Sequence, residues 1–126
     1  MNFKRIHHVA IIASDYQKSK DFYTDILGLE IIQENYRPER DSYKLDLKIG
    51  ESEIELFSFP DPPERPSMPE AAGLRHLCFY VNDIDEAVAE LNQKGVETEP
   101  IRRDEYTGGY FTFFKDPDDL PIELHE

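Results

Sequence analysis

The 126-residue sequence has a single cysteine, no tryptophan and no apolar segment of membrane-spanning length. One cysteine, Cys78, excludes a disulfide within the chain and is typical of proteins from a reducing cytoplasm. The first residues, MNFKRIHHVAII, carry two histidines in their apolar part and are followed by no small-residue cleavage site, so they are not expected to form a signal peptide. We therefore expect a cytoplasmic protein without a membrane span.

Positive charge is also scarce in this sequence. Lysine and arginine together number 14, against 27 aspartates and glutamates, which gives a formal net charge of −13. Nucleic acids and anionic membrane surfaces attract basic proteins, so this charge balance argues against both as partners. An anionic small molecule would need a local group of arginines to overcome the overall negative field.

The sequence does contain one pattern of elements that is used twice. Each copy is predicted to have a strand, a helix and then three strands. The expected strands of the first copy are 3–13, 29–36, 42–49 and 52–59, around a helix at 16–27; those of the second are 74–81, 96–103, 109–115 and 121–125, around a helix at 84–94. Between the copies, residues 60–72 hold five of the nine prolines and are predicted to form a linker or surface loop.

A shift of 68 residues aligns the two copies. It places His8 on His76, Asp15 on Asp83 at each helix start, and Ile54-Glu55-Leu56 on Ile122-Glu123-Leu124. An internal repeat of this kind predicts an α+β fold made of two tandem βαβββ modules, at about 3–59 and 73–126. The length of the chain suits a single domain, residues 1–126, built from both modules.

The repeated polar residues are expected on one face of each sheet, because strand side chains alternate between faces. The aliphatic residues beside them suit packing against the helix, so His8, Glu55, His76 and Glu123 point the other way. Taken singly, such a histidine is more often hydrogen-bonded in the core, and such a glutamate more often solvated. Four of them at one repeat offset, with the same facing, instead indicate a site for a divalent cation such as Zn, Ni, Co or Fe(II).

The motifs that carry these residues are IHHVAI at 6–11, DFYTDILGLEI at 21–31, IELF at 54–57, LRHLCFYVNDID at 74–85 and DPDDLPIEL at 116–124. They resemble the vicinal oxygen chelate superfamily, and within it the small glyoxalase I-like (lactoylglutathione lyase-like) proteins. The resemblance implies a cupped, incomplete β-barrel around a metal, with His8, Glu55, His76 and Glu123 as its ligands. Family members often have glycine after the DPD of the last turn, where this chain has Asp119.

A set of two histidines and two glutamates resembles the glyoxalase I site in particular. It implies that Ni, Co or Zn, with Fe(II) as a further candidate, binds a hemithioacetal or another substrate with neighbouring oxygens. The metal polarises a carbonyl and stabilises an enediolate while a carboxylate transfers the proton. By resemblance Glu123 is the base, and Glu55 is the second choice.

Other functions of the same fold remain alternatives at this point. One is a non-catalytic protein that binds a small ligand. Another is an extradiol dioxygenase or a thiol transferase, which usually has three metal ligands and would leave one of the two glutamates unexplained.

Substrate contacts are expected from cations and aromatic residues near the metal. Arg37, Arg40 and Arg75 are candidates, because arginine binds carboxylates bidentately. Phe57 and Phe59 are candidate cavity walls, and are equally well explained as core aromatic residues. Short family members resemble dimers in which each metal takes ligands from both subunits, so we expect a homodimer whose proline-rich linker reaches toward the partner.

Overall fold

The computed structural model describes all 126 residues and divides them into two compact units, Met1–Glu64 and Arg65–Glu126. Each unit has a four-stranded sheet and a helix, in the order expected from the repeat. The α+β class and the doubled βαβββ order are therefore confirmed. No helix of the structure has the length and apolar character needed to cross a membrane.

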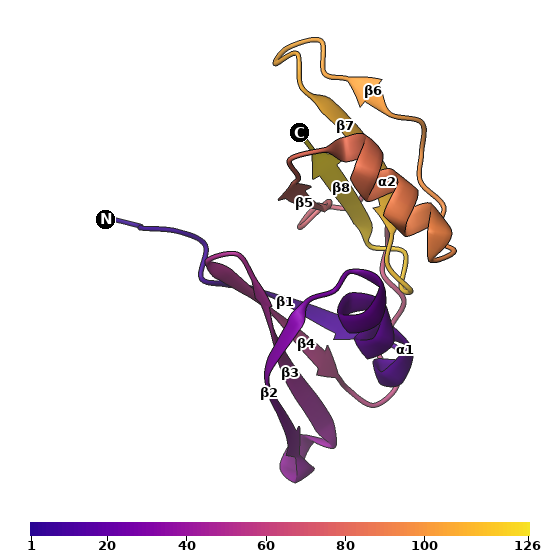
Figure 1. Ribbon diagram of the computed structural model, residues 1–126. Helices are drawn as coiled ribbons and strands as arrows, with labels where there is room; N and C mark the ends of the chain where they lie inside the picture. Colours follow the sequence, from indigo (N-terminus) through magenta and orange to yellow (C-terminus); the bar gives the residue numbers. More distant parts are fainter. The chain divides into compact units, whose positions relative to one another are not determined.

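The first unit is a sheet in the order β1-β4-β3-β2 (Figure 1). Its strands are β1 (His8–Ala13), β2 (Glu30–Arg37), β3 (Ser42–Ile49) and β4 (Ser52–Ser58). The helix α1 (Tyr16–Asp21) continues into a π-helical turn, η1 (Phe22–Ile26), and a short 3₁₀ turn, η2 (Pro38–Arg40), joins β2 to β3. β1 runs parallel to β4, whereas β3 is antiparallel to both of its neighbours.

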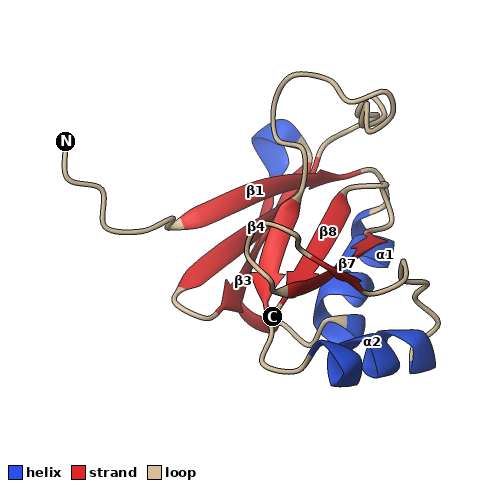
Figure 2. Cartoon of the chain, turned by 90° about the horizontal axis from the view of Figure 1, so that it is seen from above, coloured by secondary structure: helices blue, strands red, loops and turns tan.

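The second unit repeats this arrangement in the order β5-β8-β7-β6. Its elements are β5 (Leu77–Tyr80), α2 (Ile84–Gln93), β6 (Arg102–Arg103), β7 (Tyr110–Lys115) and β8 (Pro121–His125). β5 is parallel to β8, as β1 is to β4. Figure 2 shows the two helices and the strands of both units by type.

Local sequence signals explain where both helices begin. The carboxylate of Asp15 accepts a hydrogen bond from the backbone N–H of Lys18 at 3.1 Å, and Asp83 accepts one from Glu86 at 2.9 Å. Each aspartate thus satisfies one of the N–H groups that the first helical turn leaves without a partner. Gly50 lies in the left-handed region, with φ of 53°, in the turn expected between β3 and β4.

In each unit the aliphatic side chains of the central strands form the core. Ile54 and Leu56 of β4 are 2% and 0% exposed, and Ile122 and Leu124 of β8 are 0% and 5% exposed. Truncation of such a side chain to alanine costs about 2–5 kcal/mol of stability. Because neighbouring strand residues alternate between faces, this burial fixes Glu55 and Glu123 on the opposite face of their sheets.

Three expected strand boundaries were wrong, two of them because a strand begins where its partner does. β1 begins at His8 rather than at residue 3, since its partner β4 begins at Ser52. β5 begins at Leu77 rather than at residue 74, since Leu77 pairs with Ile122 at the start of β8. β6 has only two residues instead of 96–103, because Pro100 has no N–H for a ladder with β7.

Candidate functional site

The first unit brings His8 and Glu55 together. His8 opens β1 and Glu55 lies at the centre of β4, where Ala10 is its direct neighbour in the parallel ladder. The Nε2 atom of His8 is 3.6 Å from a carboxylate oxygen of Glu55, whose side chain is 16% exposed. One imidazole nitrogen and one carboxylate oxygen therefore lie side by side on the face of the sheet away from its core.

Lys44 is a second neighbour of Glu55 and was missed by the sequence analysis. Its ammonium lies 3.1 Å from Glu55 and 2.5 Å from Asp46. Burial alone would lower the pKa of Lys44, but the bonds to Asp46 and Glu55 outweigh it and raise that pKa, so the lysine stays charged. The signal for this contact was the alternation of β3, which places Lys44 and Asp46 on the face of Glu55.

The imidazole of His8 also contacts the imidazole of His7, the preceding residue. The two Nδ1 atoms are 3.0 Å apart, so one histidine donates its proton to the other. When His8 is the donor, its Nε2 atom, which lies toward Glu55, is unprotonated. This is the tautomer that a metal requires.

The second unit brings together the equivalent residues His76 and Glu123. His76 immediately precedes β5, and Glu123 lies in β8 opposite Cys78. The Nε2 atom of His76 is 2.9 Å from Glu123, and the imidazole packs edge-on against the ring of Phe113 with 5.2 Å between centroids. Arg75 donates to Nδ1 of His76 at 2.9 Å, so the imidazole carries its proton on Nε2 and donates it to Glu123.

The two glutamates differ in charge compensation. Glu55 has the ammonium of Lys44, whereas Glu123 is only 15% exposed and forms no ion pair with a lysine or arginine. Its other close neighbour is the thiol of Cys78. Burial, together with the negative charge of Glu123, raises the pKa of that thiol to about 11. The charge of Glu123 therefore lacks the compensation that Glu55 has.

Each pair supplies one nitrogen and one oxygen donor, and such N/O donors suit Zn, Ni, Co and Fe(II). No group of three or more histidine, cysteine, aspartate or glutamate side chains in the structure is arranged to hold a metal ion. The His8–Glu55 and His76–Glu123 pairs therefore each offer two donor atoms and not a complete ligand set. Ligation by His76 through Nε2 requires that this atom release the proton now shared with Glu123.

The expected substrate residues fall into two places. In the first unit the guanidinium of Arg37 lies over Phe57 at 4.9 Å from the ring centroid, and that of Arg40 lies over Phe59 at the same distance. The two rings are stacked, with 5.9 Å between centroids. Arg75 is in the second unit, against His76. The structure thus gathers four of the five expected residues around the end of β4, the strand that carries Glu55.

Comparison with known proteins agrees with the motifs and the fold. The family model described as Glyoxalase/Bleomycin resistance protein/Dioxygenase superfamily matches residues 5–124. The uncharacterized protein YwkD of Bacillus subtilis is 65% identical over 127 aligned positions, which cover 100% of this chain and 99% of YwkD. The crystal structure of a glyoxalase family protein from Enterococcus faecalis, 58% identical, covers 100% of both chains with a TM-score of 0.93.

A more distant relative has a named activity. Human mitochondrial methylmalonyl-CoA epimerase is 30% identical over 104 residues, which cover 77% of this chain and 57% of the epimerase. The resemblance seen in the sequence motifs is confirmed by the family match. The chain belongs to the glyoxalase/bleomycin resistance protein/dioxygenase superfamily, also called the vicinal oxygen chelate superfamily.

Proposed function

We propose that His8, Glu55, His76 and Glu123 together bind one divalent metal ion, and that the protein catalyses a glyoxalase I-like isomerisation. The observation that carries this proposal is the environment of Glu123, a mostly buried carboxylate without a lysine or arginine partner. An uncompensated buried carboxylate costs several kcal/mol, and a divalent cation offsets that cost. Ni, Co and Zn are the metals that suit this set of nitrogen and oxygen donors, and Fe(II) is a further candidate.

The substrate of such a site is a small molecule with neighbouring oxygens, for example a hemithioacetal. A bound divalent ion supplies Lewis-acid polarisation of those oxygens. The remaining chemistry is a proton transfer within the substrate. For a hemithioacetal, the base takes the proton from the carbon that bears the hydroxyl and the sulfur, and the electron pair moves to the neighbouring carbonyl oxygen. The proton then returns to the former carbonyl carbon, while the hydroxyl proton moves to the oxygen on that carbon, so that the first carbon becomes the thioester carbonyl.

Glu123 is better suited than Glu55 to be the base. The ammonium of Lys44 lies 3.1 Å from a carboxylate oxygen of Glu55, so Glu55 is already engaged in an ion pair. Glu123 has no such cation and lies against His76, whose imidazole packs on the ring of Phe113. The role implied by the family resemblance therefore agrees with the difference in environment.

Epimerisation is a second candidate function. It is favoured by the 30% identity with human methylmalonyl-CoA epimerase. It needs the same removal of a proton by Glu123, followed by return of the proton to the opposite face of the same carbon. Product analysis separates the two functions. Isomerisation exchanges the oxidation levels of two neighbouring carbons, whereas epimerisation inverts the configuration at one carbon.

The test is replacement of Glu123 by glutamine in protein purified without a metal-affinity tag. Loss of a general base lowers turnover by about 10²–10⁴-fold. We expect Glu123→Gln to lose turnover of hemithioacetals to this extent while it retains much of the bound metal, measured by elemental analysis. Glu86→Gln on α2 is the control and should keep full turnover.

Unchanged turnover in Glu123→Gln would refute its role as the base. The metal content of the wild-type protein separates the other functions of the fold. Fe(II) with oxygen uptake would indicate a dioxygenase, and a wild-type protein that binds no divalent metal would indicate a metal-free binding protein.

A further inference from the structure

Arg37 and Arg40 stand out because both lie over the ring of Phe59 and neither forms an ion pair with a carboxylate. The chain has 27 acidic residues against 14 basic ones, so carboxylates are plentiful. Arg37 donates one hydrogen bond, to the hydroxyl of Ser42 at 2.9 Å, and its buried Nε atom has no partner. Arg40 lies over Phe59, 4.9 Å from the ring centroid. Both guanidinium groups therefore keep donors for an anion.

The other arginines of the structure are engaged in a different way. Arg5 pairs with Glu51 at 3.3 Å, and Arg102 pairs with Glu99 at 2.6 Å. Arg65 donates to two backbone carbonyls, Arg75 to His76, and Arg103 to the carbonyl of Gly108. Arg75 and Arg103 also lack an acidic partner, but each lies 6.0 Å from the centroid of its aromatic ring. Arg37 and Arg40 differ in that both guanidinium groups lie over the same ring, Phe59, and each approaches a ring centroid to 4.9 Å.

Aromatic stacking gives these two arginines a defined position. Arg37 lies over Phe57 at 4.9 Å and over Phe59 at 5.7 Å, and Arg40 lies over Phe59 at 4.9 Å. A stacked guanidinium loses less side-chain freedom when it binds a ligand, and its planar N–H groups match a carboxylate or a phosphate. The stacking therefore orients the donors before any ligand arrives.

The arginines follow the strand that carries the proposed metal ligand. Glu55, Phe57 and Phe59 alternate with helix-facing residues along β4 and the residue after it, so they share one face. At a rise of about 3.3–3.4 Å per residue, Phe57 is roughly 7 Å and Phe59 roughly 13 Å from Glu55 along the strand. Lys44 lies opposite Phe57 in the β3–β4 ladder, but its charge is paired with Asp46 and Glu55, which leaves Arg37 and Arg40 as the cations of this row without an acidic partner.

We infer that Arg37 and Arg40 bind an anionic group, a carboxylate or a phosphate, at the end of the substrate away from the metal-binding oxygens. This inference rests on the proposed function, because it takes Glu55 as a metal ligand. The substrate class is then a small acid with two neighbouring oxygens at one end and an anionic group about 7–13 Å away. In the second unit Arg102 lies over Phe111 at 4.8 Å, but its charge is taken by Glu99.

The test uses nickel-loaded protein and three hydroxamic acids of equal chain length. All three chelate the metal through the hydroxamate, and they end in a carboxylate, a phosphate or a neutral amide. We expect at least one anionic probe to bind about tenfold or more tightly than the amide by calorimetry, because hydrogen bonds to charged groups are strong. The stronger of the two anionic probes identifies whether the group is a carboxylate or a phosphate.

Variants assign this preference to the two arginines. Arg37→Gln and Arg40→Gln should each lose most of the preference for the anionic probe and should bind the amide as the wild type does. Arg102→Gln is the matched control, since it also removes an arginine stacked on phenylalanine, and it should keep the preference. Equal binding of all three probes by the wild-type protein would overturn the inference.

A second measurement does not depend on the metal. In metal-free protein, the side-chain Nε–H nuclear magnetic resonance signals of Arg37 and Arg40 should shift when glutarate or inorganic phosphate is added, and the signal of Arg102 should not. If no hydroxamate binds the nickel-treated protein but these signals shift, the proposed metal site fails and the anion site stands. If neither signal shifts for either anion, the inference fails, whatever the metal content.

Discussion

At the scale of single residues, the His8–Glu55 and His76–Glu123 pairs have the same residue types and differ in what surrounds them. Glu55 lies beside Lys44, whereas Glu123 lies beside the thiol of Cys78. The residue aligned with Cys78 in the first unit is Ala10, which has no polar side chain. The repeat therefore conserves the donor atoms between its two copies but gives them different electrostatic partners.

The rate at which Cys78 is alkylated in metal-free protein reports the effect of the Glu123 charge on the thiol. Because burial and the charge of Glu123 raise the pKa of the thiol to about 11, little thiolate exists at pH 8. We expect iodoacetamide to alkylate Cys78 of the folded protein about 100-fold more slowly at pH 8 than in urea, where the thiol has an ordinary pKa near 8.5. Mass spectrometry at timed intervals gives both rates.

Glu123→Gln provides the comparison for this measurement. It removes the negative charge but keeps the size of the side chain, so the thiol pKa should fall and alkylation should become faster. Glu86→Gln should leave the rate unchanged. A folded wild-type protein that is alkylated as fast as the unfolded chain would contradict the raised pKa.

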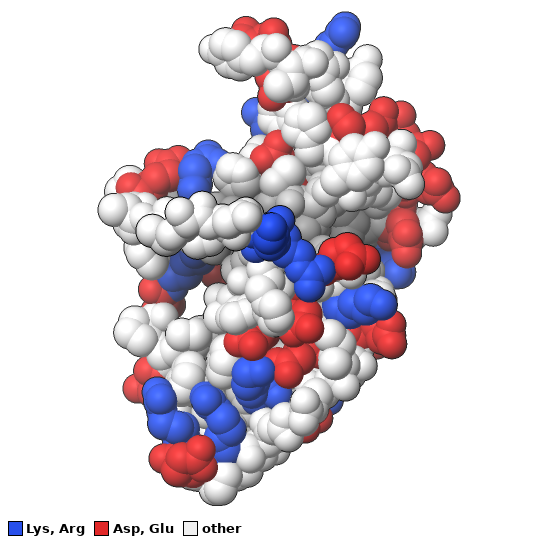
Figure 3. All heavy atoms as spheres, turned by 90° about the vertical axis from the view of Figure 1, so that its left-hand side faces the viewer, with Lys and Arg blue, Asp and Glu red and all other residues white.

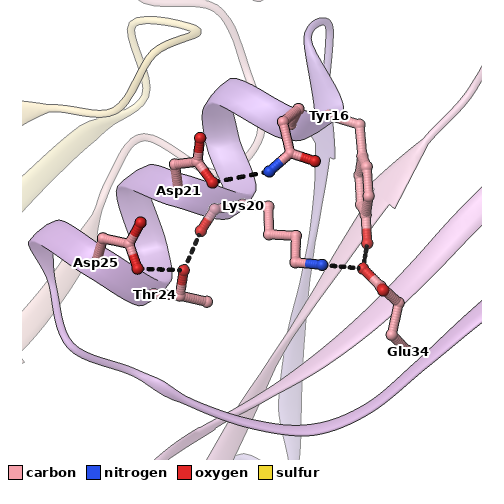
Figure 4. Close-up of polar contacts among 7 residues, drawn as sticks. Tyr16, Lys20, Asp21, Thr24, Asp25 and Glu34 are labelled. Atoms are coloured by element: carbon pink, nitrogen blue, oxygen red, sulfur yellow. Dashed lines mark hydrogen bonds and ion pairs between the residues drawn. The ribbon is translucent and has the colours of Figure 1, made fainter.

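At the scale of elements, the carboxylate of Glu34 in β2 binds two side chains of α1 (Figure 4). Glu34 of β2 accepts a hydrogen bond from the hydroxyl of Tyr16. It also forms an ion pair with Lys20, with 2.8 Å between the charged atoms. The bonds from Lys20 and Tyr16 hold the pKa of Glu34 below its usual range. Burial and the nearby Glu34 raise the pKa of Tyr16, so its hydroxyl remains a donor.

The stability that Glu34 contributes has a defined pH dependence. A carboxyl group whose pKa is lower in the folded state stabilises the fold above its unfolded pKa, and this contribution is lost as the pH falls through the folded value. We expect Glu34→Gln to lower the free energy of unfolding by about 1–2 kcal/mol at pH 7, measured by urea denaturation. The difference from wild type should shrink as both proteins are acidified below pH 4.

Glu30→Gln is the matched control for Glu34→Gln. Glu30 lies on the same strand and is exposed, so its replacement should change stability by less than about 0.5 kcal/mol. A Glu34→Gln variant as stable as wild type at pH 7 would show that the contacts of Glu34 do not fasten α1 to β2.

The sequence predicts the helices and strands, and the sheet face on which Glu55 and Glu123 lie, for a clear physical reason. Hydrophobic alternation and helix caps are local, so they are visible in β4, in β8 and at Asp15 and Asp83. Strand ends are not local: β5 is short because Leu77 is where pairing with β8 starts. Likewise, the contacts of Lys44 with Glu55 and of Arg37 with Phe57 depend on register between strands, which the order of residues does not reveal.

At the scale of the whole molecule, the formal net charge is −13. On the face drawn in Figure 3, lysine and arginine side chains are interspersed with aspartates and glutamates. Anion binding in this protein must therefore depend on a few well-placed arginines, as proposed for Arg37 and Arg40.

In the proposed metal site, the His8–Glu55 and His76–Glu123 pairs come either from one chain or from two chains. We expect a homodimer in which the His8–Glu55 pair of one protomer and the His76–Glu123 pair of its partner share an ion, giving two ions per dimer. A solution monomer with one ion per chain would contradict this arrangement. Native mass spectrometry of protein purified without a metal-affinity tag measures both mass and metal content.

A heterodimer of two defective chains tests the sharing of ligands directly. One chain carries His8→Ala and Glu55→Ala, the other carries His76→Ala and Glu123→Ala, and two different tags isolate the mixed dimer after co-expression. If ligands are shared between protomers, the intact pairs of the two chains meet at one of the two sites, so the mixed dimer should bind about half the metal of wild type. If each chain forms its own site, both sites lack a pair and the mixed dimer should bind no more metal than either defective homodimer.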